Sequence, residues 1–229
     1  MADAVRPYVI RQGDYLVQLA ARFGFDADTV WNRAENDPLR AAGRSPNVLW
    51  PSDVLYIPDD DPPSVPLAIG ASNSFTASVT KVPVTLSFHD ETGAPLATAD
   101  CTYHGLDAEP SDAPLQTNDS GSLMLLLPVD QAPFIIELPS LGMFFKILVG
   151  HLDPHTSRSG ALQRLHNLGY GGRSYFGPDV EPDADDGLQE QRDERFKRLL
   201  QSFQYDRGIP ETGELDATTI DALKEAHGS

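Results

Sequence analysis

The chain has 229 residues, with 34 Asp and Glu against 17 Lys and Arg, and a net charge of −17. Because phosphate groups bind to basic surfaces, this charge argues against nucleic acid and anionic membranes as partners. The longest apolar run, residues 123–127, is far too short for membrane insertion. The single cysteine, Cys101, rules out an intramolecular disulfide. The first ten residues contain no secretory signal, so we expect synthesis in the cytoplasm.

The first predicted elements lie in residues 8–58 and form a strand, two helices and a second strand. After a turn, Asp14 can cap the first helix, and Gly24 is expected to end it. Asp26 or Asp28 can cap the second helix. The segment ends with a short strand of alternating residues, 54–57, which has a proline on each side. We therefore predict a strand-helix-helix-strand unit, the first module, with domain limits 1–58.

The order and spacing of "YVIRQGDYLVQLAARFG … NVLWPSDVLYIP" resemble a LysM module. Modules of that family are small folds that bind polymers containing N-acetylglucosamine, such as peptidoglycan or chitin. Two positions depart from the family pattern: Tyr15 stands where Thr or Ser is usual, and Ser52 stands where Gly is usual. The resemblance implies that this module binds glycan.

The same resemblance implies a sugar groove between two loops. Backbone groups and Asn47 would bond to the N-acetyl and hydroxyl groups of the glycan, while Tyr15 or Trp50 would stack on a sugar face. The alternative is that Trp50 and Leu49 are core or lid residues that contact no ligand. The glycan-binding residues predicted in this module are Gly13, Asp14, Tyr15, Leu16, Asn47, Val48, Leu49 and Trp50.

Residues 59–66 contain three aspartates and three prolines and are predicted to form a short, semi-rigid linker. Residues 67–150 then contain short apolar runs separated by Gly, Pro, Asn and Asp, which is typical of a small antiparallel β-sandwich or barrel. The pattern "VTLSFHDETGAPL … TNDSG" resembles the prealbumin-like or carboxypeptidase-regulatory-like β-sandwich family. That resemblance implies a spacer or interaction domain, which we call the β-domain.

Two groups of chemically reactive side chains lie in or next to the β-domain. His151, Asp153 and His155 are types of residue that bind zinc, but they lie at a domain junction without a partner cysteine, and we favour a solvated linker. Cys101 with His104 could indicate a thiol nucleophile, but no third member is identifiable, and we favour a semi-buried cysteine. We therefore predict no catalytic residue, no metal site and no cofactor.

Residues 151–229 are predicted to form three short helices around one small core, and we call them the helical module. Gly169 is expected to end the first helix, and Asp216 is expected to cap the third. The apolar positions recur at helical spacing. They are Leu162, Leu165 and Leu168 in the first helix, and Phe196, Leu199, Leu200 and Phe203 in the second.

The strings "LQRLHNLGY" and "LLQSFQYDRGIPETGELDATTIDAL" resemble the peptidoglycan-binding domain found on many wall hydrolases. The resemblance implies glycan-binding roles for Tyr170, Tyr175 and Phe176. An acidic insertion at 179–193 separates the two strings. We interpret it as a solvating loop, and the alternative is a docking surface for a basic partner.

The whole chain is predicted to be a multidomain α+β protein. Its composite of modules resembles accessory proteins linked to type VI secretion and related contractile injection machines. The first hypothesis is a non-enzymatic protein that binds peptidoglycan or another N-acetylglucosamine polymer, and is periplasmic or exported by such a machine. The second is a structural adaptor that binds spike, tube or effector proteins. The third and weakest is a peptidoglycan hydrolase.

Overall fold

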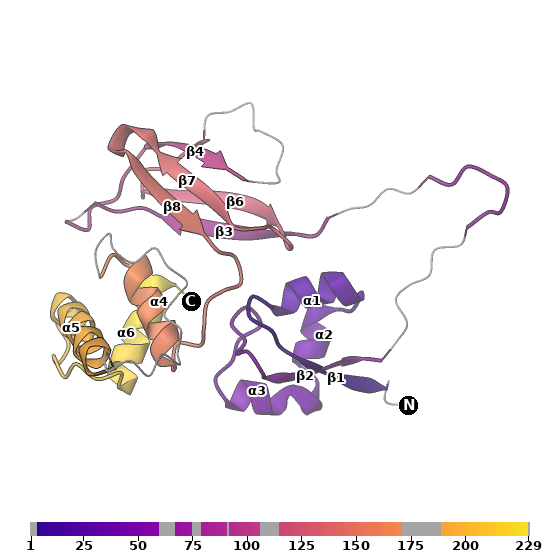
Figure 1. Ribbon diagram of the computed structural model, residues 1–229, viewed down its shortest axis with the longest axis horizontal. Coiled ribbons are helices and arrows are strands. Elements are labelled where there is room, and N and C mark those ends of the chain that lie inside the picture. Colours follow the sequence, from indigo (N-terminus) through magenta and orange to yellow (C-terminus); the bar gives the residue numbers. More distant parts are fainter. Residues whose placement is uncertain are drawn as a thin grey trace. The chain divides into compact units, whose positions relative to one another are not determined.

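The computed structural model describes residues 4–59, 67–74, 79–90, 92–105, 115–170 and 189–228. The chain divides into two compact units, Met1–His151 and Leu152–Ser229. Helices and antiparallel sheets are both present, so the predicted α+β class is confirmed (Figure 1). Within the described ranges, no helix has the length and apolar character needed to cross a membrane.

The first module contains the strand-helix-helix-strand order expected from its sequence, with one more short helix before the second strand. Its two strands pair antiparallel, with Tyr8 opposite Leu55. The elements are β1 (Val5–Val9), α1 (Leu16–Phe23), α2 (Ala27–Trp31), the 3₁₀ turn η1 (Ala34–Asn36), α3 (Asp37–Ala41) and β2 (Val54–Pro58). The additional η1 and α3 are built from the segment between the two predicted helices and β2.

The ends of α1 and α2 follow the sequence signals with one exception. Gly24 ends α1 with a left-handed φ of 76°, and Asp26 caps α2 by accepting a hydrogen bond from Thr29 N at 2.8 Å. Asp14 does not cap α1, contrary to the prediction. Its Oδ2 instead accepts from Tyr8 Oη at 2.9 Å and Arg11 N at 2.8 Å, so Asp14 closes the turn before the helix.

One polar side chain is fully buried in the core of the first module. Asn36 donates from Nδ2 to Val30 O at 2.8 Å and to Tyr56 O at 3.0 Å. Its Oδ1 accepts from Tyr56 N at 2.8 Å. Because a buried amide is stable only when hydrogen-bonded, these contacts fix η1 against β2. The apolar core around it consists of Ile10, Leu16, Leu19, Val30, Leu39, Leu49, Leu55 and Ile57.

Ser52 lies in the tight turn before β2 with a φ of +78°, which is uncommon for a residue with a Cβ. The same position is one where the resembled family has glycine. We therefore expect Ser52→Gly to raise the free energy of unfolding by about 1 kcal/mol, because glycine adopts this conformation without strain. Urea unfolding of the two proteins measures the difference, and a loss of stability would contradict the expected relief of strain.

The β-domain consists of two antiparallel sheets that share one core (Figure 1). One sheet pairs β3 with β6, and the other has the order β5-β4-β7-β8. Phe88 and Phe145 meet across the core with ring centroids 5.2 Å apart. The strands are β3 (Lys81–Ser87), β4 (Asp100–His104), β5 (Leu115–Gln116), β6 (Ser122–Pro128), β7 (Phe134–Leu138) and β8 (Met143–Ile147), with the 3₁₀ turn η2 (Pro139–Leu141) before β8.

The described residues of the unit Leu152–Ser229, 152–170 and 189–228, form three helices: α4 (Arg158–Asn167), α5 (Gln189–Arg207) and α6 (Ala217–His227). Asp216 caps α6 as predicted, by accepting from Thr219 N at 2.8 Å. The buried face of α4 differs from the prediction, because Leu162 is only half-buried while Ala161 and Arg164 are fully buried. The core residues are Ala161, Leu165, Leu200, Phe203 and Leu223.

Candidate functional site

The two loops predicted to form the sugar groove lie next to each other. Leu16 N at the start of α1 donates to Pro46 O at 2.9 Å. Ser52 N donates to Ile10 O at 2.9 Å, and Ile10 N donates to Asp53 O at 2.9 Å. These backbone bonds join the segment before α1 to the segment before β2. The sequence-predicted residues of the first module are therefore brought together at one end of the module.

Tyr15 is not available at that end, contrary to its predicted role in stacking on a sugar. Its side chain is 4% exposed, and its hydroxyl donates to Val129 O in the β-domain at 2.7 Å. Burial, and then the negative charge of Asp130, raise the pKa of Tyr15 to about 12. The ring is thus enclosed by protein rather than presented to solvent.

Leu16 and Leu49 also lie in the interior, at 1% and 5% exposure. Both belong to the apolar core of the first module. Their side chains therefore cannot line an open groove, and the alternative that made Leu49 a core residue is the correct one. Gly13 and Asp14 are half-buried, and Asp14 is occupied by its bonds within the turn.

Three further predicted residues remain at least partly accessible in the segment 47–50. Asn47 is exposed, while Val48 and Trp50 are half-buried. Trp50 N donates to Asp53 Oδ2 at 2.9 Å, and the Arg44 guanidinium carbon lies 6.0 Å from the centre of a Trp50 ring. Arg44 Nε also donates to Asp53 Oδ2 at 2.8 Å. These contacts fix the backbone turn at Trp50 and place Arg44 near its half-buried indole.

The helical module contributes one described candidate, Tyr170. Its ring meets Phe203 edge-on with centroids 5.6 Å apart, and its hydroxyl donates to Asp206 at 2.8 Å. Burial and this contact with Asp206 raise the pKa of Tyr170 to about 12. The other two candidates, Tyr175 and Phe176, lie outside the described residues, as does most of the predicted acidic insertion.

The thiol considered as a nucleophile is in a poor environment for that role. Cys101 is 5% exposed, and burial raises the pKa of its thiol. Alternate residues of a strand point to opposite faces, so His104, three positions along β4, faces away from Cys101. His104 Nε2 instead lies 3.1 Å from Glu137 Oε2. The part of the chain that the structure describes contains no group of three or more His, Cys, Asp or Glu residues that could hold a metal ion.

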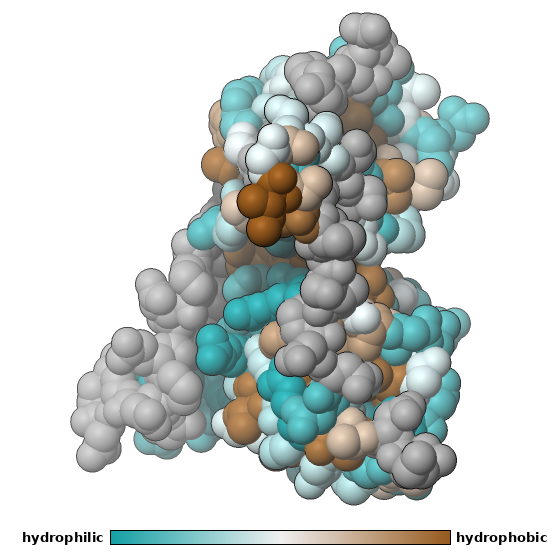
Figure 2. All heavy atoms as spheres, turned by 90° about the vertical axis from the view of Figure 1, so that its right-hand side faces the viewer, coloured by the Kyte–Doolittle hydropathy of each residue, from teal (hydrophilic) through white to brown (hydrophobic). Residues whose placement is uncertain are grey.

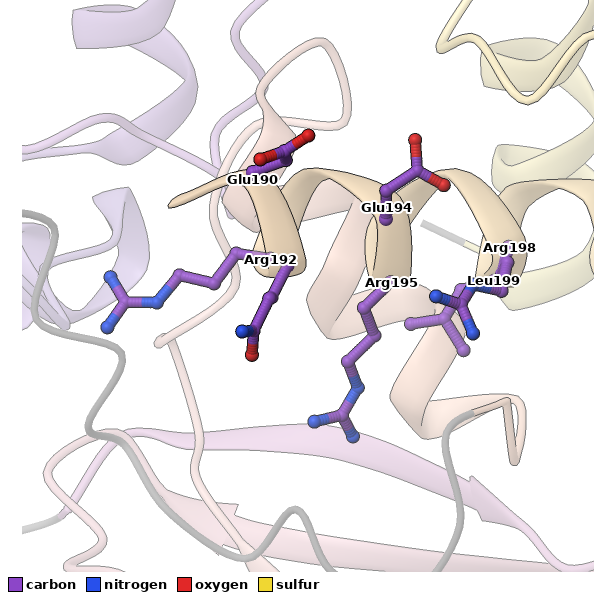
Figure 3. Close-up of a pocket in the computed structure, with 7 residues that line it drawn as sticks. Glu190, Arg192, Glu194, Arg195, Arg198 and Leu199 are labelled. Atoms are coloured by element: carbon purple, nitrogen blue, oxygen red, sulfur yellow. The ribbon is translucent and has the colours of Figure 1, made fainter. Parts of the chain in front are cut away.

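A charged surface on α5 was not predicted. Figure 3 shows Arg192 and Arg195 extending to one side of the helix, with Glu190 and Glu194 on the opposite side. Guanidinium groups at such helical spacing are suited to binding carboxylates. The residues lining the pocket along this helix are Glu190, Gln191, Arg192, Glu194, Arg195, Arg198 and Leu199. The signal in the sequence was the repetition of arginine every three residues.

Where described residues are visible in Figure 2, small apolar areas lie between hydrophilic ones. The accessible polar and aromatic groups around Trp50 are therefore the best-defined candidate site of the first module. Comparison with models of known protein families, with curated proteins and with solved structures finds no match to this chain.

Proposed function

We propose that this chain is a non-enzymatic protein that binds peptidoglycan or another N-acetylglucosamine polymer, in association with a type VI-like secretion or contractile injection apparatus. The observation that carries the proposal is the surface formed by Asn47 and Trp50. It combines a partly exposed indole with an exposed amide on two adjoining turns of one loop.

The chemistry of this surface suits a sugar that carries an N-acetyl group. An indole face packs against the apolar C–H face of a pyranose ring. The Asn47 amide both donates and accepts hydrogen bonds, which matches the acetamido group of the sugar. Arg44 and Asp53 form an ion pair beside the ring, so the site itself carries no large net charge.

Short-range contacts of this kind are required because the whole chain carries a charge of −17. An anionic wall polymer would repel such a protein at long range. A second weak site in the helical module, around Tyr170, would add avidity if both modules engage one polymer. The two resemblances thus support one binding function carried by two modules.

The test is co-sedimentation of the full chain with insoluble peptidoglycan sacculi. We expect the double variant Asn47→Ala, Trp50→Ala to bind at least tenfold more weakly, since it removes both the stacking surface and the amide. Phe144→Ala is the matched control, because Phe144 is an exposed aromatic residue (55%) in the β-domain. Equal sedimentation of the double variant and the control would contradict a glycan site at Trp50.

A second candidate function is a structural adaptor whose modules bind proteins of the apparatus. The observation that favours it is the burial of Tyr15 against Val129, which uses a loop expected to contact sugar for a protein contact instead. Absence of sedimentation on both sacculi and chitin would favour this candidate. Binding to a spike, tube or effector protein would then be the activity to measure.

A further inference from the structure

A segment of the β-domain and the segment at its C-terminal end enclose the loop that begins α1. Val129, directly after β6, accepts the hydroxyl of Tyr15, and Val129 is itself 7% exposed. Gly150 and His151, which follow β8, approach the same loop from a different part of the sequence. We call this set, Tyr15 with Val129, Gly150 and His151, the Tyr15 latch. All four residues belong to the unit Met1–His151.

Gly150 shows how closely the segment after β8 packs against the loop before α1. A Cβ on Gly150 would lie 2.5 Å from Tyr15 Cδ1 and 2.8 Å from Gly13 O. Neither distance is tolerated by packed atoms, so only glycine fits while the latch is closed. A Cβ on Gly13 would lie 3.1 Å from the imidazole ring of His151. The loop and the end of the β-domain are therefore in direct contact through backbone as well as side chains.

We propose that the Tyr15 latch is autoinhibitory, so that the β-domain covers one half of the glycan groove until the latch opens. The inference rests on the proposed glycan-binding function. Leu16 N is bonded to Pro46 O, which places Tyr15 directly beside the loop that carries Asn47. Opening the latch would expose a second aromatic ring next to the Trp50 surface without disturbing the core of the first module.

The latch is built to be reversible. Tyr15 is held by its bond to Val129 O and by its packing against Gly150, whereas the core of the first module contains eight buried apolar residues. Breaking the contact therefore leaves the module folded. A polymer that binds Tyr15 in the open state would favour that state in proportion to its affinity for it.

Gly150→Ala tests the latch, because its Cβ intrudes on Tyr15. Gly142→Ala is the matched control: Gly142 also has a positive φ, of 59°, but nothing lies within 4 Å of its added Cβ. Nitration by tetranitromethane, mapped to Tyr15 by peptide mass spectrometry, reports exposure of the phenol. We expect Tyr15 to be nitrated at least fivefold faster in Gly150→Ala than in the wild type or the control.

Co-sedimentation with sacculi then tests the consequence. We expect Gly150→Ala to bind several-fold more tightly than the wild type, with Gly142→Ala unchanged. Tyr15→Phe is a second variant, which removes the bond to Val129 O but keeps a ring that can stack, and it should also bind more tightly. Near-ultraviolet circular dichroism verifies that each variant is folded.

Fast nitration of Tyr15 in the wild type would overturn the closed latch. Faster nitration in Gly150→Ala without tighter binding, while the wild type still sediments, would overturn autoinhibition and leave the proposed function standing. No sedimentation of any variant, even with Tyr15 reactive, would overturn both the autoinhibition and the glycan-binding function.

Discussion

Replacing Asn36 by alanine is expected to lower the free energy of unfolding of the first module by about 3 kcal/mol. The side chain is fully buried and makes three hydrogen bonds, two to Tyr56 and one to Val30. Alanine leaves three backbone groups in the interior without these partners, and it opens a cavity between η1 and β2. Urea unfolding, followed by the fluorescence of Trp31 and Trp50, measures the change.

Asn32→Ala is the matched control for this substitution. Asn32 lies four residues earlier, is exposed, and its amide donates only to Asp28 O at 2.8 Å. We expect it to change stability by less than about 1 kcal/mol, because water replaces an exposed partner. A similar loss for both variants would show that the effect of Asn36→Ala does not come from burial.

The Asn36→Ala variant can also be used to determine which module binds the glycan. The separate unit Leu152–Ser229 has its own core, so we expect it to stay folded at a temperature where the first module of the variant is unfolded. If the Trp50 surface is the main glycan site, sedimentation with sacculi is lost on heating at the lower melting temperature of the variant. Retained sedimentation would place the main site in the helical module.

Local signals in the sequence were sufficient for much of the fold. Gly24 ends α1, and Asp26 and Asp216 cap α2 and α6, because each acts through backbone groups within four residues of itself. The alternation of apolar residues in β3 likewise predicted a strand. The continuous apolar run 123–127 was predicted to be a buried strand, and β6 is a strand, but Met124 and Leu126 face solvent. Such signals depend on neighbours along the chain, and a single sequence contains them in full.

The features that were missed depend on partners far apart in sequence. Tyr15 bonds to a residue 114 positions away, and no local pattern distinguishes that from a tyrosine exposed to sugar. From the sequence alone Asn36 looks like a surface turn residue, because its partner Tyr56 lies 20 residues further along the chain, in β2. Arg164 is buried because Asp153 O and Gly160 O accept from its guanidinium, at 2.8 and 3.0 Å. Within the candidate site the prediction for Tyr15 was affected most, since its burial is decided by the contact with Val129.

The second large effect is expected at Gln204 on α5, which is fully buried. Its Nε2 donates to Thr219 Oγ1 at 2.8 Å and to Thr212 Oγ1 at 3.0 Å, and its Oε1 accepts from Gly213 N at 2.8 Å. One side chain therefore ties α5 to the turn before α6 and to α6 itself. Gln204→Ala should cost about 3 kcal/mol, which lowers the melting temperature of so small a unit by about 15 °C.

Differential scanning calorimetry measures this change, and Gln191→Ala, an exposed glutamine on the same helix, is the matched control. A fall in melting temperature of less than about 4 °C for Gln204→Ala would contradict the importance of the network. The result also bears on the resemblance to peptidoglycan-binding domains. Gln204 and Thr219 belong to the strings that carry that resemblance, but they hydrogen-bond to each other and stabilise the packing of α5 against α6. Those strings therefore support the proposed three-helix module more directly than they support its ligand, and binding by this module has to be tested at Tyr170.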